Sequence, residues 1–108
     1  MDIRKAIEKT VERQNLSAQE AFLVASDIMQ GNAADAQIGA LLTALRMKGE
    51  TPDEIAGFAR GMRSRAPAVD ASYEHSVDTC GTGGDKKQTI NISTISAFVA
   101  AGAGCRVF

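Results

Sequence analysis

The chain has 108 residues, and its 12 Lys and Arg against 13 Asp and Glu give a formal net charge of −1. This balance disfavours proteins that bind nucleic acid or anionic membranes through a basic surface. The sequence shows no signal-like hydrophobic core at its start and no apolar run of membrane-spanning length. Its two cysteines, Cys80 and Cys105, lie far apart and fit neither a disulfide scaffold nor a zinc knuckle. These features predict a cytoplasmic protein with reduced thiols and with no nucleic-acid or membrane partner.

Two helices are expected within residues 2–31. Asp2 is a suitable N-cap for a short first helix, and Ser17 followed by Glu20 forms a capping box for a second helix that Gly31 would end. The expected apolar face of the first helix is Ile3, Ile7 and Val11. The expected apolar face of the second is Ala21, Phe22, Ala25, Ile28 and Met29. Both segments are therefore predicted to be amphipathic.

Two further helices follow. The third is expected to begin at Asn32 or Asp35 and to end before Gly49. Residues 51–54 combine an N-cap hydroxyl, a proline at the first helical position and a glutamate at the third, which predicts the start of the fourth helix. The expected inward residues of these two helices are Ile38, Leu41, Leu42, Leu45, Ile55, Phe58, Ala59 and Met62. Residues 1–66 are thus predicted to form a helical domain of about four helices.

Small residues recur along the third and fourth predicted helices. They are Gly39, Ala40, Ala44, Gly57 and Gly61. Small side chains let helix axes approach closely, either within the domain or across a dimer. Packing within the domain is the favoured interpretation, because exposed apolar faces on monomers are uncommon. We expect Met29, Met47 and Met62 to pack in the same core.

The composition changes after Pro67. Residues 67–74 are typical of a linker, residues 75–79 predict a short strand, and residues 93–103 return to helical composition. Ser93 or Thr94 is the expected cap of this helix, Gly102 or Gly104 its expected end, and a second strand follows at residues 105–108. The order strand, loop, helix, strand builds a parallel sheet. Since the sequence stops as the second strand begins, residues 75–108 are expected to be the start of an incomplete α/β domain.

The loop between the strand and the helix is the polar stretch CGTGGDKKQTINIST, residues 80–94. Gly81, Gly83 and Gly84 remove side chains that would keep a ligand from main-chain amides, and the helix start adds unpaired donors, so a phosphate group is the predicted ligand. Asp85 would repel a phosphate unless a cation bridges the two, which predicts a magnesium-accompanied phosphosugar. The alternative is a turn that only reverses the chain, because glycine loops are weak motifs and this loop lacks P-loop and dinucleotide spacing.

Three single residues carry further expectations. His75 has no neighbouring nucleophile and is expected at a solvent-exposed edge rather than in catalysis. Cys80 is expected to be a small buried filler rather than a reactive thiol. Cys105 is expected in the core of the second strand.

Several segments together resemble the anthranilate phosphoribosyltransferase family. They are GTGGD (81–85), NIST (91–94), SAFVAA (96–101), AQIGALLTALR (36–46) and KGET (48–51). The resemblance implies a mainly α chain, with an amino-terminal helical domain followed by the first strand-loop-helix-strand unit of an α/β phosphoribosyltransferase domain. It also implies transfer of phosphoribosyl from phosphoribosyl pyrophosphate to the amine of anthranilate in tryptophan biosynthesis, with Mg²⁺ as cofactor, and a homodimer formed through the helical domain.

The resemblance also implies the binding residues. Gly81, Gly84, Asp85, Thr89, Asn91, Ile92, Ser93 and Thr94 would surround phosphoribosyl pyrophosphate. Gly81 would also lie near anthranilate, Ser93 would contact magnesium, and no residue is implied to be a nucleophile. The family commonly has valine at Cys80 and glycine at Lys86, which are departures outside the implied contacts. The family's basic Lys-His-Gly-Asn-Arg segment and its acidic magnesium pair would follow Phe108, so the 108-residue chain is expected to be inactive alone.

Two alternatives stay open. A pyrimidine nucleoside phosphorylase-like enzyme has a similar helical domain, but its glycine loop carries a Lys-x-Ser-x-Gly-Gly pattern that this loop lacks. The second alternative is not an enzyme: the isolated chain would be a helical dimerisation module.

Overall fold

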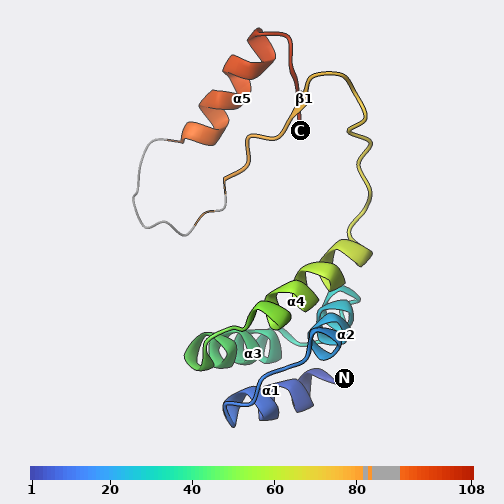
Figure 1. The fold of residues 1–108 in the computed structure, drawn as a ribbon, viewed down its shortest axis with the longest axis vertical. Helices are drawn as coiled ribbons and strands as arrows, with labels where there is room; N and C mark the ends of the chain where they lie inside the picture. The colour runs from blue at the N-terminus through green and yellow to red at the C-terminus, as the bar shows by residue number, and fades with distance from the viewer. Residues whose placement is uncertain (82, 84–90) are drawn as a thin grey trace. The chain divides into compact units, whose positions relative to one another are not determined.

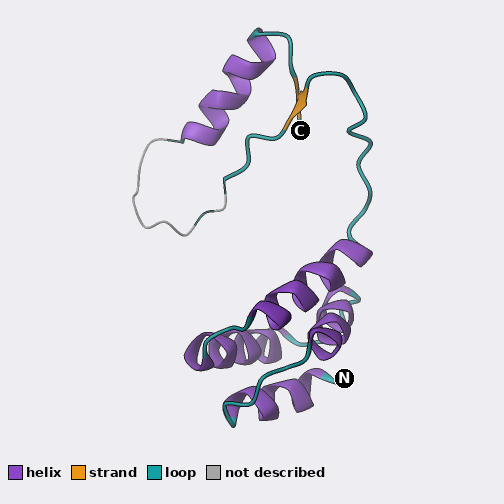
Figure 2. Cartoon of the chain, in the orientation of Figure 1, coloured by secondary structure: helices purple, strands orange, loops and turns teal. Residues whose placement is uncertain are grey.

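The computed structural model describes residues 1–81, 83 and 91–108. The chain divides into two units, Met1–Pro67 and Ala68–Phe108. Figures 1 and 2 show helices joined by short turns in the first unit, and a helix and a short strand in the described part of the second. The expected fold class, mainly α with the beginning of a parallel sheet, is confirmed. The helical unit consists of α1 (Ile3–Val11), α2 (Ala18–Met29), α3 (Asp35–Lys48) and α4 (Pro52–Arg65).

Three of these helices begin at the predicted caps. The Asp2 side chain accepts a hydrogen bond from a first-turn amide of α1. Ser17 and Glu20 form the capping box of α2, in which Glu20 Oε2 accepts the Ser17 N–H at 2.8 Å. Thr51 and Glu54 form the corresponding box of α4, and there Glu54 Oε2 accepts the Thr51 N–H at 2.7 Å. These starts follow from residues within four positions of each other.

The third helix begins at Asp35, one of the two predicted starts, with Ala34 in the N-cap position. Alanine offers no side-chain acceptor, and Gln37 instead reaches back so that its Oε1 accepts the Ala34 N–H at 3.0 Å. Gly31 and Gly49 adopt φ angles of 80° and 90° after α2 and α3. Both glycines therefore stand where a left-handed residue stops a helix.

The core of the helical unit is built by α2 packing along α4 and α1 packing on α3. Its buried residues form one cluster: Ile3, Ala6, Leu16, Ala21, Val24, Leu41 and Leu45. Thr10 is also buried, because its hydroxyl donates to the Ala6 carbonyl at 2.8 Å and needs no solvent partner. The fully buried residues of α1 are thus Ile3, Ala6 and Thr10. The predicted Ile7 packs against this core while partly buried, and the predicted Val11 is exposed.

The contact between α2 and α4 depends on two glycines. A Cβ added to Gly57 would lie 2.3 Å from the Ala18 carbonyl oxygen, and one added to Gly61 would lie 2.5 Å from Ala25 Cβ. Only hydrogen fits at either position, so the two helix backbones approach each other there. The prediction of close packing within the domain is confirmed for Gly57 and Gly61. Gly39 and Ala40 are instead exposed.

Part of the predicted core is exposed in the structure. Residues expected inside but exposed in the structure are Val11, Met29, Leu42, Met47, Ile55, Ala59 and Met62. The prediction weighted apolar bulk, whereas α4 turns its small face, with Gly57 and Gly61, toward α2. Ile55 and Met62 consequently point outward, with 59% and 53% of their surfaces exposed.

The second unit contains β1 (Ser76–Val77), α5 (Ile92–Gly102) and β2 (Arg106–Val107). The strands are parallel, with Ser76 opposite Arg106 and Val77 opposite Val107. Both strands are shorter than predicted, and Cys105 precedes β2 and is only partly buried, so its assignment to a strand core was wrong. Gly104 has a φ of 96° and follows the end of α5, as one of the two predicted stops.

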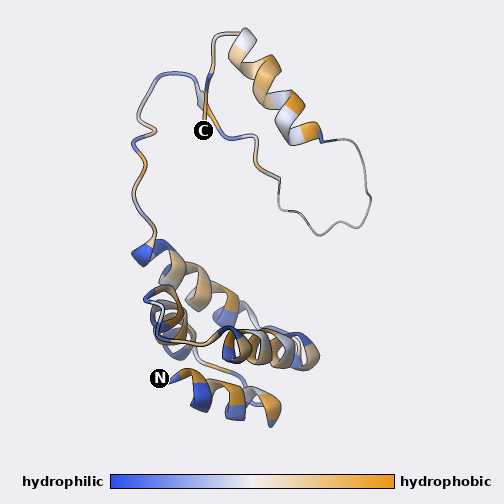
Figure 3. Ribbon diagram, turned by 180° about the vertical axis from the view of Figure 1, so that it is seen from behind, coloured by the Kyte–Doolittle hydropathy of each residue, from blue (hydrophilic) through white to orange (hydrophobic). Residues whose placement is uncertain are grey.

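The apolar residues of α5 lie on its surface. Ile92, Ile95, Phe98 and Val99 are all more than half exposed, and Figure 3 shows hydrophobic colour along this helix. A two-stranded sheet with one helix buries little apolar surface by itself. No helix in the described part of the chain is both long and apolar enough to cross a membrane.

Candidate functional site

The start of the glycine loop lies against the first turn of α5. A Cβ added to Gly81 would be 3.4 Å from Ser93 Oγ, the nearest atom to it. Gly83 adopts a φ of 71°, a conformation that favours glycine. The structure therefore brings together two residues that the sequence assigned to one site, Gly81 and Ser93. The lack of a side chain at Gly81 leaves the Ser93 hydroxyl open on that side.

The amino terminus of α5 is arranged to favour an anion. Asn91 is its N-cap, and Asn91 Oδ1 accepts the Thr94 N–H at 3.3 Å, so the predicted caps Ser93 and Thr94 were wrong. The first turn contains no acidic side chain, which leaves the positive end of the helix dipole uncompensated by its own residues. The amides of Ile92 and Ser93 have no acceptor within a helix that begins at Ile92. These amides and the partly buried Ser93 hydroxyl can donate to a phosphate oxygen.

Three of the predicted site residues, Gly84, Asp85 and Thr89, lie outside the described residues. Their part in the site stays a prediction. Among the residues that the structure does describe, no group of three His, Cys, Asp or Glu side chains could hold a metal ion. Magnesium prefers six oxygen ligands, which are commonly carboxylates, phosphates and waters. Ser93 therefore fits a magnesium ion only as one neutral ligand beside the oxygens of a bound phosphate compound.

The residues before the loop differ from expectation at one position. Cys80 is exposed, so its assignment as a buried filler was wrong. The sheet pairing of β1 ends at Val77, which places Cys80 in a loop where its N–H donates to Asp78 Oδ1 at 2.9 Å. His75 is exposed as predicted, and its φ of 58° lies in the left-handed region.

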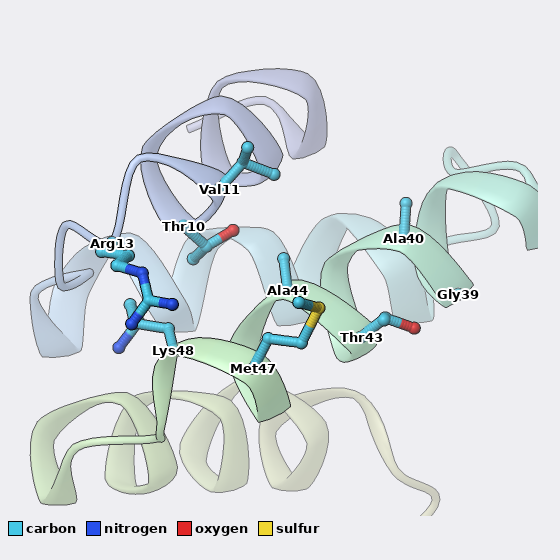
Figure 4. Close-up of a pocket in the computed structure, with 9 residues that line it drawn as sticks. All are labelled: Thr10, Val11, Arg13, Gly39, Ala40, Thr43, Ala44, Met47 and Lys48. Carbon is cyan, nitrogen blue, oxygen red and sulfur yellow. The ribbon is translucent and has the colours of Figure 1, made fainter.

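A groove between α1 and α3 is the second surface feature, with a volume of about 370 Å³. This α1–α3 groove is lined by Thr10, Val11, Arg13, Gly39, Ala40, Thr43, Ala44, Met47 and Lys48. Figure 4 shows Arg13 and Lys48 together at one end of it. Val11 and Met47 are 66% and 72% exposed, and the sequence had placed both in the core. The small residues Gly39 and Ala40 were the available signal for this surface.

Both units resemble domains of known proteins. Residues 4–66 match the helical bundle domain of a glycosyl transferase family, and residues 73–108 match the a/b domain of a glycosyl transferase family. The chain is 53% identical over 105 residues to an anthranilate phosphoribosyltransferase of Alkaliphilus metalliredigens, covering 97% of this chain and 31% of the relative. It is 56% identical over 105 residues to that of Pelotomaculum thermopropionicum, covering 97% of this chain and 30% of the relative.

A solved structure gives the same likeness. The crystal structure of an anthranilate phosphoribosyltransferase from Thermus thermophilus aligns with a TM-score of 0.73 at 38% sequence identity. The alignment covers 94% of this chain and 31% of that one. The chain thus spans just under a third of the length of the proteins it resembles.

Proposed function

The chain belongs to the glycosyl transferase family that this helical bundle domain defines, and we propose that it is part of an anthranilate phosphoribosyltransferase. The reaction moves phosphoribosyl from phosphoribosyl pyrophosphate to the amine of anthranilate and releases pyrophosphate, as a step of tryptophan biosynthesis. The observation that carries this proposal is the 53% identity over 105 residues to a relative of that name. The same likeness favours this activity over a nucleoside phosphorylase-like one.

The role proposed for the described residues is to bind and orient the phosphate-bearing substrate. The Ile92 and Ser93 amides donate to a phosphate oxygen, and the Asn91 side chain, already holding the Thr94 N–H, keeps the first turn in place. Because these donors are fixed before the reaction, they stabilise negative charge on the departing pyrophosphate. Magnesium, which we propose as the cofactor with Ser93 as one ligand, supplies further neutralisation of that charge when bound. The amine then attacks the anomeric carbon without a nucleophile from this chain.

The activity is proposed for the longer protein rather than for these 108 residues alone. The curated relatives are about three times as long, and residues 75–108 build only two short strands and one helix in their described part. We propose a cytoplasmic enzyme without nucleic-acid or membrane partners. The net charge of −1 supports the absence of a partner that binds through a basic surface.

A chimaera tests the proposed activity. Residues 1–108 replace the matching segment of the Alkaliphilus enzyme, to which they are 53% identical, and turnover is followed by the loss of anthranilate fluorescence. We expect turnover by the chimaera, and none by the 108-residue chain alone. Gly81→Val should lower kcat/KM at least about tenfold, because its branched side chain enters the space beside Ser93 Oγ. Ser93→Ala should raise the magnesium concentration needed for half-maximal rate.

Matched controls exist on the same helix. Ser96→Ala removes a hydroxyl one turn further along α5, and Gly102→Ala adds a Cβ where no atom lies within 4 Å. Both should leave kcat/KM within about twofold of the unmodified chimaera. A folded chimaera without turnover would refute the proposed activity, and equal losses in Ser93→Ala and Ser96→Ala would refute the role of Ser93.

We further propose that two copies associate through the α1–α3 groove. Val11 and Met47 are exposed there beside Gly39 and Ala40, so a second copy could bury apolar surface with close helix approach. A twofold axis through this groove would place the same surface of each copy against the other, as in most homodimers. Sedimentation of Met47→Lys should show monomers at concentrations where the unmodified chain dimerises. Met62→Lys, which changes an exposed methionine of α4 outside the groove, should leave the dimer intact. A monomeric unmodified chain would contradict this proposal.

A further inference from the structure

The Glu54 carboxylate joins three separate segments of the helical unit. Its side chain is fully buried, and Glu54 Oε1 accepts the Leu16 N–H at 2.8 Å across 38 positions of sequence. Glu54 Oε2 accepts the Thr51 N–H at 2.7 Å and the Lys48 ammonium at 3.0 Å. One side chain therefore holds the linker between α1 and α2, the turn before α4 and the end of α3.

Lys48 bonds to the same linker. Only 4% of its side chain is exposed, and Lys48 Nζ donates to Asn15 Oδ1 at 3.0 Å and to the Gly49 carbonyl at 2.8 Å in addition to Glu54. Buried ion pairs lose solvation that their mutual attraction only partly returns, so such a pair is weak evidence of stability in itself. What distinguishes this pair is geometry, because each partner bonds to one of two consecutive linker residues, Asn15 and Leu16.

The first helix depends on that linker for its position. Leu16 follows α1 in the chain, and its side chain is 2% exposed within the hydrophobic core. Besides its packing on α3, α1 has an ion pair to α2 between Lys9 and Glu20, with 30% and 27% of these side chains exposed. A pair so open to solvent contributes little. The buried bond from the Leu16 amide to Glu54 is thus the stronger polar attachment of the segment that carries α1, and the bond from Lys48 to the exposed Asn15 adds to it.

We propose that the Glu54–Lys48 pair is a clamp that seats α1, so that breaking it releases residues 3–16 as one unit while α2 and α4 stay packed. The pairing of α2 with α4 rests on Gly57 and Gly61, which follow Glu54 on the buried face of α4 and meet α2 at Ala18 and Ala25. Thr10, Val11 and Arg13 form one wall of the α1–α3 groove, so the clamp also holds that wall against α3.

Amide hydrogen exchange on the 108-residue chain tests the clamp. In the unmodified chain the Leu16 amide should exchange at least about tenfold more slowly than an unstructured amide, although it lies outside any helix. Glu54→Gln places an amide with one acceptor oxygen before three donors, so they cannot all be satisfied. We expect exchange in α1 and at Leu16 to rise about tenfold or more, with central amides of α2 and α4 within about threefold of their original rates.

Glu20→Gln is the matched control, because Glu20 has the same capping box and the same lysine partner type but lies near the surface. It should leave exchange at Leu16 unchanged. Lys48→Met tests the other half of the clamp and should also raise exchange in α1. The proposal is overturned if the Leu16 amide is unprotected in the unmodified chain, if α4 loses protection as much as α1, or if Glu54→Gln unfolds the whole unit.

Discussion

Substitution of Gly57 by alanine tests how the helical unit is packed. The added Cβ would lie 2.3 Å from the Ala18 carbonyl oxygen and 2.7 Å from Ala21 Cβ. Carbon atoms in good contact are about 3.5–4.0 Å apart, so the two helices must separate by roughly 1 Å or more. The nearest atom belongs to the backbone of α2 and cannot rotate away. Overpacking of this kind costs about 1–3 kcal/mol, and the better helix propensity of alanine returns about 1 kcal/mol.

The expected result of Gly57→Ala is a free energy of unfolding lowered by up to about 2 kcal/mol. It is measured by urea denaturation followed by circular dichroism at 222 nm, at a concentration where sedimentation shows monomers. Gly39→Ala is the control, because Gly39 is also within a helix but a Cβ there meets no atom within 4 Å. That variant should raise the free energy of unfolding by about 0.5–1 kcal/mol. If both variants stabilise the chain, the close approach of α2 and α4 is refuted.

Three other measurements follow. Burial opposes ionisation of Glu54, but hydrogen bonds from two backbone amides and Lys48 outweigh it and hold its pKa below the ordinary 4.5. The ionised group therefore contributes stability that is present above about pH 4.5 and lost as the pH falls through the folded-state pKa. The free energy of unfolding should consequently fall less between pH 6 and about pH 3 in Glu54→Gln than in the unmodified chain, as measured by denaturation at the two pH values. Cys80 is exposed and Cys105 partly buried, so a thiol reagent should modify Cys80 about tenfold faster, and equal rates would contradict the structure. Arg13 has a φ of 61°, and Arg13→Gly should raise the free energy of unfolding by about 0.5–1 kcal/mol, whereas a decrease would show that the arginine side chain outweighs the backbone strain.

The candidate site could be located from sequence only in part. The glycines and the polar residues after them indicated a phosphate site, and the structure places Gly81 beside Ser93 at a helix start. The predicted N-caps of α5 were wrong, because Asn91 Oδ1 accepts the Thr94 N–H. Serine, threonine and asparagine are all good N-cap residues, so composition alone could not choose among neighbours. Gly84, Asp85 and Thr89 remain predictions.

Contacts between distant residues left almost no sequence signal. Arg106 lies over the Tyr73 ring at 4.0 Å, and that ring stacks on Phe108 with centroids 6.3 Å apart. Nothing in the spacing of these residues predicted the cluster. It forms because β2 pairs in parallel with β1, which brings both ends of the second unit to the same sheet.

The sequence by itself determined where α1, α2 and α4 begin and where α2 and α3 end, because N-caps and left-handed glycines act within about four residues. Which face of each helix is buried was decided only by the tertiary structure. Alpha-helical spacing identified apolar residues such as Ile55 and Met62, but burial depends on how closely a partner backbone can approach, and that partner approaches at Gly57 and Gly61. The same holds for Glu54, whose local role as a cap was readable, while its bond to Leu16 required the folded chain to bring the two together.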